Sequence, residues 1–111
     1  MKTFDEYQRL ARRTQNRSLS PEERERHALH GLAGEVGEIH SLYQKAMQGH
    51  PFDEAHLVSE MGDILWFLDE LADVHHVTLA EIAWHNIEKL RRRFPDGFSE
   101  DKSLHRAEGD I

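Results

Sequence analysis

The stretch Glu35-Val36-Gly37-Glu38-Ile39 returns, slightly altered, as Glu60-Met61-Gly62-Asp63-Ile64. In each copy two acidic residues stand three positions apart, a spacing that places both side chains on one face of an α-helix. Like charges at that spacing repel each other, so helix stability does not explain a pattern that occurs twice. Four carboxylates from two helices would suit hard divalent cations such as Mg²⁺ or Mn²⁺, which prefer oxygen ligands.

The apolar residues around both copies recur with the period of a helix. The first stripe comprises Leu29, Leu32, Val36, Ile39 and Tyr43, and the second comprises Leu57, Met61, Ile64, Leu68 and Leu71. At about 100° per residue, each acidic pair lies roughly 60° and 120° to the same side of its stripe. Two such helices packed antiparallel would therefore bring all four carboxylates to one cleft.

Start and stop signals predict four helices, which span residues 3 to about 15, 21–48, 54–74 and 79–93. The clearest start is Ser20-Pro21-Glu22-Glu23, with an N-cap serine, proline at the first helical position and glutamate at the third. Gly49 and then Pro51 end the second helix. No segment alternates with period two, so no sheet is expected and the predicted fold class is all-α.

Composition narrows the class of function. The chain has 111 residues and no cysteine, and its formal net charge is −7. The acidic balance argues against a nucleic-acid polymer or an anionic membrane as partner, and no apolar run is long enough to span a bilayer. We expect a cytoplasmic protein, because the N-terminus carries no apolar signal core. Residues 1–99 are predicted to form one domain and residues 100–111 a loose polar tail.

Two features leave alternatives open. Gly31, Gly34, Gly37 and Gly62 are costly inside helices and indicate either close helix packing or space for metal and ligand. Nine histidines invite a transition-metal site, but the Glu-x-x-His pairs of a di-iron helical bundle are absent.

Trp66 lies opposite the apolar stripe of its helix, so we expect that helix to pack on two partners, one of them a second subunit.

The ordered set of motifs resembles the MazG-like all-α nucleoside triphosphate pyrophosphohydrolases. Glu35-x-x-Glu38 is followed, after a spacer of about twenty residues, by Glu60-x-x-Asp63, and the surrounding residues 31–38 and 60–66 are also similar. Downstream, residues 86–90 (Asn-Ile-Glu-Lys-Leu) and 93–98 (Arg-Phe-Pro-Asp-Gly-Phe) are similar to the closing motif of that family. The resemblance covers about residues 4–99.

The resemblance implies a four-helix bundle-like MazG fold, completed by dimerisation, and Mg²⁺-dependent hydrolysis between the α and β phosphates of a nucleoside triphosphate. The implied metal ligands are Glu35, Glu38, Glu60 and Asp63, with Mn²⁺ as an alternative ion. Lys89, Asn86 and Arg93 would contact the phosphates or the sugar. Among the ligands, Glu38 is our choice for the group that accepts a proton from the attacking water.

The first helix adds Gln8, together with Arg12 and Thr14, as polar candidates for contact with the base or ribose, although such polar residues are also ordinary on a surface helix. For the assembly we expect a homodimer or homotetramer. A different class of function also fits these residues, namely a non-catalytic helical oligomerisation or regulatory module whose acidic cleft binds metal. The sequence does not identify the base or the sugar of the substrate.

Overall fold

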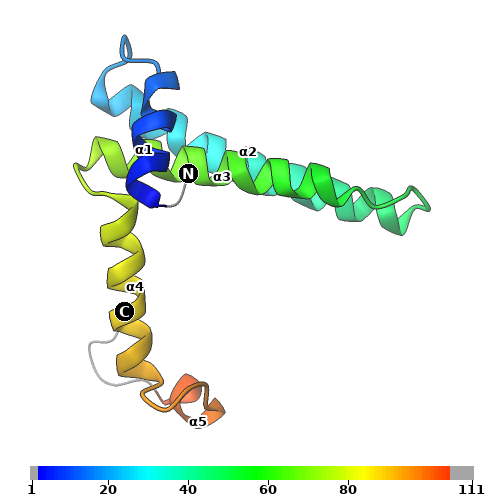
Figure 1. Cartoon of the computed structure of the whole chain (residues 1–111). Helices are drawn as coiled ribbons and strands as arrows, with labels where there is room; N and C mark the ends of the chain where they lie inside the picture. The colour runs from blue at the N-terminus through cyan, green and yellow to red at the C-terminus, as the bar shows by residue number, and fades with distance from the viewer. Residues whose placement is uncertain (1–2, 106–111) are drawn as a thin grey trace.

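The computed structural model describes residues 3–105, and all regular structure in this range is helical (Figure 1). The elements are α1 (Phe4–Ala11), the 3₁₀ turn η1 (Arg12–Thr14), α2 (Pro21–Met47), α3 (Glu54–Val74), α4 (Leu79–Arg93) and α5 (Glu100–Leu104). Between residues 3 and 105 the nearest approach to sheet structure is an isolated bridge between Pro95 and Gly97. The predicted all-α class is confirmed.

Local signals account for the helix boundaries. The Ser20 hydroxyl accepts a hydrogen bond from the backbone N–H of Glu23, whose carboxylate accepts one from the N–H of Ser20, so the predicted capping box is present. Asp53 and Thr78 cap α3 and α4 in the same way, through their side-chain oxygens. The chain leaves α2 at Gly49, where φ is +98°, a left-handed conformation that favours glycine.

Two predicted segments differ from the structure. The first helix was expected to continue to about residue 15, but α1 ends at Ala11 and tightens into η1. Residues 100–104 form the short helix α5, although a loose tail was expected there. The remaining part of that tail, residues 106–111, lies outside the described residues.

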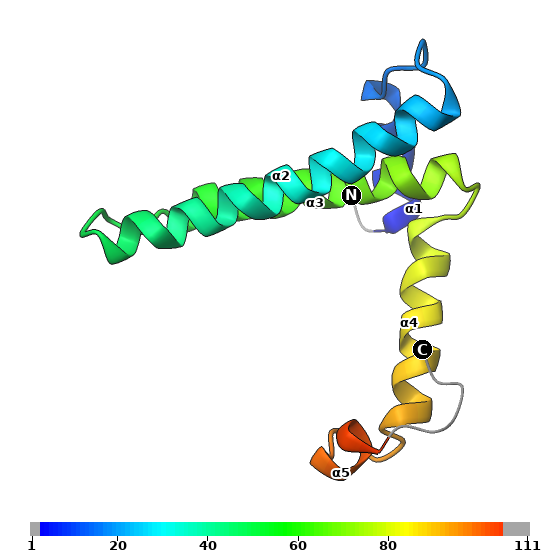
Figure 2. The same cartoon turned by 180° about the vertical axis from the view of Figure 1, so that it is seen from behind.

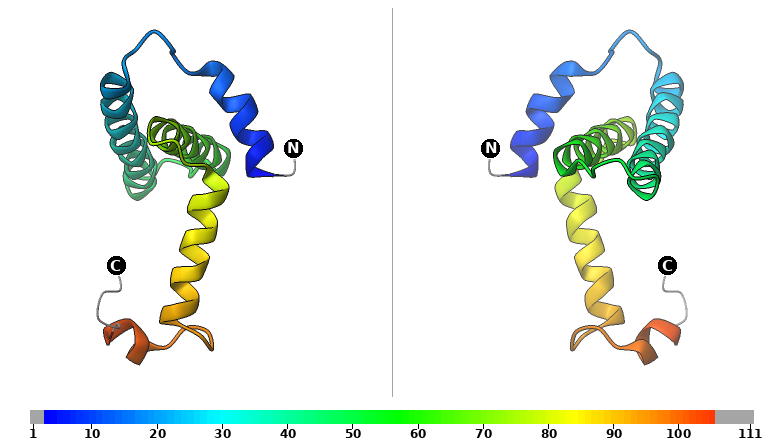
Figure 3. Two further views of the ribbon diagram at one scale, coloured as in Figure 1. Left: turned by 90° about the vertical axis from the view of Figure 1, so that its left-hand side faces the viewer. Right: turned by 90° about the vertical axis from the view of Figure 1, so that its right-hand side faces the viewer.

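Helices α2 and α3 run antiparallel and side by side as a long hairpin (Figures 1 and 2). Helix α1 crosses the open end of this hairpin, and α4 leaves the same end in a different direction (Figure 3). One chain therefore does not enclose a four-helix bundle, because α4 lies away from most of the hairpin.

A network of ion pairs holds the segment after α1 on the hairpin. Arg12 donates two hydrogen bonds to the buried carboxylate of Asp69, at 3.0 and 3.2 Å. One carboxylate oxygen of Asp73 forms ion pairs with the guanidinium groups of Arg24, at 2.7 Å, and Arg17, at 2.9 Å. Burial opposes the ionisation of Asp73, but its hydrogen bond to Arg24 and the charges of Arg12 and Arg17 outweigh burial and lower its pKa.

Trp66 also packs within the chain. Its indole N–H donates a hydrogen bond of 2.8 Å to the hydroxyl of Thr14 in η1. The second packing partner that we expected for this face of α3 is therefore supplied in part by η1, and the position of Trp66 is not by itself a sign of a second subunit.

The molecule is more extended than a compact domain of the same number of residues. Its radius of gyration is 17.3 Å, whereas a compact domain of this length would have about 13 Å. Among residues 3–105 the buried apolar residues are few and mostly small: Ala11, Ala28, Ala72 and Leu79. Within residues 3–105, none of the helices combines the length and the apolar character needed to cross a bilayer.

Candidate functional site

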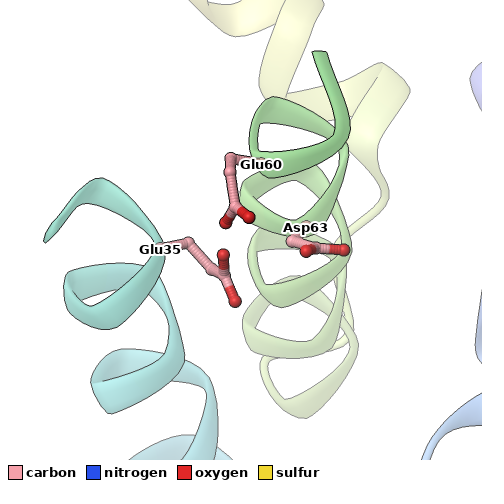
Figure 4. Close-up of side chains that lie close together, drawn as sticks. All are labelled: Glu35, Glu60 and Asp63. Carbon is pink, nitrogen blue, oxygen red and sulfur yellow. The ribbon is translucent and has the colours of Figure 1, made fainter. Parts of the chain in front are cut away.

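Three of the repeated acidic residues meet between α2 and α3. One carboxylate oxygen from each of Glu35, Glu60 and Asp63 lies within 4.8 Å of the other two. Glu35 and Glu60 point toward each other across the space between the helices, and Asp63 follows one turn along α3 (Figure 4). The antiparallel hairpin thus brings residues from both copies of the repeat together. The predicted apolar stripes are only partly buried, however, since Leu29, Val36, Tyr43 and Met61 are exposed.

Glu38 is the exception among the four predicted ligands. Its side chain is exposed, and its oxygens lie outside the cluster formed by the other three carboxylates. Its negative charge is nevertheless close enough to act on Glu35. The two glutamates of the first copy, which look equivalent in sequence, therefore differ in burial and in their distance from α3.

The cluster carries more negative charge than its surroundings can stabilise. A hydrogen bond shared with Glu60 is the largest cause that raises the pKa of Glu35, to about 7. Burial and the charges of Glu60, Asp63 and Glu38 shift the pKa in the same direction. A cation beside Glu35 would favour its ionised form and so oppose this rise in pKa.

A divalent cation fits this arrangement. The Oε2 atoms of Glu35 and Glu60 are buried and have no hydrogen-bond partner, which is costly unless a ligand satisfies them. The oxygens bound to one Mg²⁺ ion lie at most about 4.2 Å apart, and the observed limit of 4.8 Å requires only a small closure of the side chains. The donor set consists of oxygen alone, as magnesium prefers.

Two residues near the cluster were missed in the sequence. The ring Nε2 of His56 lies 3.1 Å from Oε1 of Glu60, one helical turn away, and restrains that carboxylate. Burial, followed by the negative charges of Asp69 and Asp63 on α3, raises the pKa of Tyr7 of α1. The spacing of His56 and Glu60 was a usable signal, whereas only the folded chain brings Tyr7 to this place.

The predicted phosphate-binding residues are not brought to the acidic cluster by their own chain. Asn86, Lys89 and Arg93 belong to the C-terminal half of α4, which lies away from the α2–α3 hairpin in opposite views (Figures 1 and 2). Lys89 is partly buried and Asn86 is exposed. The structure places these residues on one helix and the acidic cluster on two others.

Gln8 has a structural partner. Its side chain is buried, and its oxygen accepts a hydrogen bond from the backbone N–H of Leu79, the first residue of α4. This bond joins α1 to α4 and uses the oxygen that we expected to meet substrate. Contact of Gln8 with the base or ribose stays a prediction.

The glycines of the repeat fall into two groups. A Cβ atom at Gly31 would overlap the ring of Phe67, so this glycine permits close packing of α2 on α3. A Cβ at Gly34, Gly37 or Gly62 would meet no atom within 4 Å. Close packing therefore explains Gly31, whereas the use of the open space beside the other three glycines by metal or ligand stays a prediction.

Comparison with known proteins identifies similar sequences. The family model described as "MazG nucleotide pyrophosphohydrolase domain" matches residues 23–98, which include most of α2, all of α3 and α4, and the three clustered carboxylates. The Gene 37 protein of Mycobacterium phage L5 is 31% identical over 68 residues, a match that covers 57% of this chain and 60% of that protein. The chain thus spans less than two thirds of this relative. No solved structure gives a significant match.

Proposed function

Because the chain belongs to the MazG nucleotide pyrophosphohydrolase domain family, we propose that it hydrolyses a nucleoside triphosphate between the α and β phosphates. The products are a nucleoside monophosphate and pyrophosphate. The observation that carries this proposal is the cluster of Glu35, Glu60 and Asp63, in which two buried oxygens lack a partner. The proposal extends to ribo- and deoxyribonucleotides alike.

Each carboxylate has a part in the proposed reaction. Glu35, Glu60 and Asp63 hold Mg²⁺, which when bound neutralises phosphate charge and lowers the pKa of coordinated water. Glu38 is exposed and outside the cluster, so its carboxylate remains available to accept the proton of the attacking water. His56 keeps the carboxylate of Glu60 in place through the 3.1 Å contact.

The phosphate side of the site is assigned to α4. Lys89 and Arg93 supply positive charge for phosphate oxygens, and Asn86 supplies an amide for phosphate or sugar. Since α4 of the same chain lies away from the hairpin, we assign these residues to the acidic cluster of a second copy. The active assembly is then a homodimer or a homotetramer.

Two observations support that assembly. The accessible surface is 8354 Å², while a compact monomer of this mass would expose about 6,300 Å². The excess of roughly 2,000 Å² is more than the 800 Å² or so that each partner buries in a standard interface. Trp84, Ile87 and Leu90 of α4 are 56, 42 and 39% exposed, respectively, and recur at helical spacing along that helix.

A panel of ribo- and deoxyribonucleoside triphosphates, incubated with Mg²⁺ or with EDTA, tests the reaction by release of pyrophosphate. We expect release with Mg²⁺ only, and a loss of at least about 100-fold in kcat/KM for Glu60→Gln and Asp63→Asn. The matched control is Glu54→Gln, an exposed acid on the same helix, which should keep wild-type rates.

Either of two results would refute the proposal. One is the release of no pyrophosphate from any nucleotide by the folded wild-type chain, which would favour the non-catalytic metal-binding module. The other is near-wild-type turnover by Glu60→Gln and Asp63→Asn at saturating Mg²⁺, which would exclude the acidic cluster as the reacting site.

A further inference from the structure

A second polar pair joins α2 to α3 beyond the acidic cluster. Nδ1 of His27 lies 2.6 Å from Oε1 of Glu70. The side chain of Glu70 is fully buried, while that of His27 is 48% exposed. The other oxygen of Glu70 is buried without a hydrogen-bond partner. A buried carboxylate therefore holds one nitrogen of a histidine whose opposite edge is accessible.

The pair belongs to an ordered series of contacts along the hairpin. His27 precedes Glu35 by eight residues and Glu70 follows Asp63 by seven; on antiparallel helices both displacements run in the same direction. They correspond to about 12 and 10 Å along the two helix axes. Midway between the two sites, the ring of Phe67 packs at Gly31. Along the hairpin, from the acidic cluster toward its open end, the order is therefore carboxylates, the ring of Phe67, and the pair of His27 and Glu70.

Aromatic rings surround the histidine. The ring of His27 meets Phe67 edge-on at 5.5 Å between centroids and Trp66 at 6.3 Å. Aromatic side chains form walls against which nucleobases pack, since every base presents a π-face.

The pair differs from the ion pairs that fasten η1. The guanidinium of Arg12 is fully occupied there, since it contacts Asp69, Asp73 and the backbone oxygen of Val77. His27 by contrast uses one ring nitrogen for Glu70, and its Nε2 has no partner among residues 3–105. A histidine oriented by a carboxylate and open at its other nitrogen is typical of a residue that binds a ligand.

We propose that His27 contacts the nucleoside part of the nucleotide and that Glu70 is its positioning residue. The inference rests on the proposed function, in which the phosphates lie at the acidic cluster and the sugar and base extend away from it. The Nε2 atom then forms a hydrogen bond with the sugar or the edge of the base, so His27 contributes to the choice of nucleotide. Glu70 fixes the plane and the tautomer of the ring by accepting a hydrogen bond from the Nδ1–H group.

The test uses the full chain with Trp84→Phe, so that Trp66 is the remaining tryptophan and reports binding beside His27. Because Trp84 lies on the exposed apolar face of α4, sedimentation equilibrium and kcat/KM first verify that this variant keeps the wild-type assembly and activity. Nucleoside monophosphates, which the proposed reaction does not consume, are titrated with Mg²⁺ present by Trp66 fluorescence, and kcat and KM are measured for each triphosphate with Mg²⁺. The variants are His27→Gln and Glu70→Gln. The matched control is His75→Gln, because His75 and Glu25 form another 2.6 Å histidine–glutamate pair between the same two helices, but an exposed one.

We expect His27→Gln to weaken monophosphate binding and to raise KM by about tenfold, as loss of one good hydrogen bond implies. The rise should differ between bases, with a smaller change in kcat. Glu70→Gln should act in the same direction, and His75→Gln should stay within about twofold of wild type. If Glu70→Gln does not fold, His27→Gln decides alone, since His27 is half exposed.

Affinities and KM values within about twofold of wild type in His27→Gln would overturn the inference. A chain that releases pyrophosphate while Trp66 responds to no monophosphate would also overturn it, but would leave the proposed function standing. A chain that binds monophosphates through His27 and hydrolyses no triphosphate would support the inference about His27 and refute the proposed function. The two proposals therefore fail in distinguishable ways.

Discussion

Glu35 shows how the acidic cluster affects the stability of the metal-free protein. Its pKa is about 7 in the folded chain, against an ordinary value of 4.5. Between these values the folded state binds more protons than the unfolded state, so the contribution of Glu35 to stability falls as the pH rises.

We therefore expect the melting temperature in EDTA to fall more steeply between pH 5 and about pH 7 for wild type than for Glu35→Gln, as followed by circular dichroism. Saturating Mg²⁺ should reduce the difference, because a bound cation favours the ionised carboxylates. Identical pH profiles for the two proteins in EDTA would contradict the raised pKa of Glu35.

At the scale of elements, the packing of α2 on α3 depends on a few small residues. A methyl group at Gly31 would overlap the Phe67 ring, which is itself packed against His27 and Trp66, so the ring has little freedom to move. Gly34 lies one turn further along the same helix and has open space beside it.

Gly31→Ala should lower the free energy of unfolding by about 1–3 kcal/mol, the usual cost of overpacking. Gly34→Ala is the matched control and should raise it by up to about 1 kcal/mol, because alanine favours a helix over glycine. Urea denaturation of both variants measures the difference. A stabilised Gly31→Ala protein would show that α2 and α3 are not closely packed at Phe67.

At the scale of the whole molecule, a single chain leaves large apolar side chains exposed on α4, as it does on α2 and α3. If a second copy covers the exposed apolar face of α4, Ile87→Glu should shift the protein toward monomer in sedimentation equilibrium at micromolar concentration, since burying an unpaired charge in an interface is costly. The control is Met47→Glu, because Met47 is 89% exposed at the end of α2. This variant should not shift the protein toward monomer.

The same variant connects the assembly to the reaction. Because Asn86, Lys89 and Arg93 are assigned to the site of the second copy, Ile87→Glu should lose kcat/KM in parallel with the loss of dimer. A wild-type chain that is monomeric and fully active would contradict both the assembly and the shared site.

The sequence alone determined the features that depend on local chemistry and period. The capping residues Ser20, Asp53 and Thr78 set three helix starts, and the repeated motif predicted that its carboxylates meet between two antiparallel helices. These follow from neighbours close in the chain, for which spacing is enough.

Only the tertiary structure decided which residues with matching positions in the motif differ in burial and in their partners. Glu38 lies outside the cluster although its motif matches that of Asp63, and Gln8 binds the start of α4. His27 and Glu70, forty-three residues apart, become a pair. The direction in which α4 leaves the hairpin likewise depends on the contacts of the folded chain. Burial and partners across the chain depend on how helices cross, and no spacing within one helix encodes that crossing.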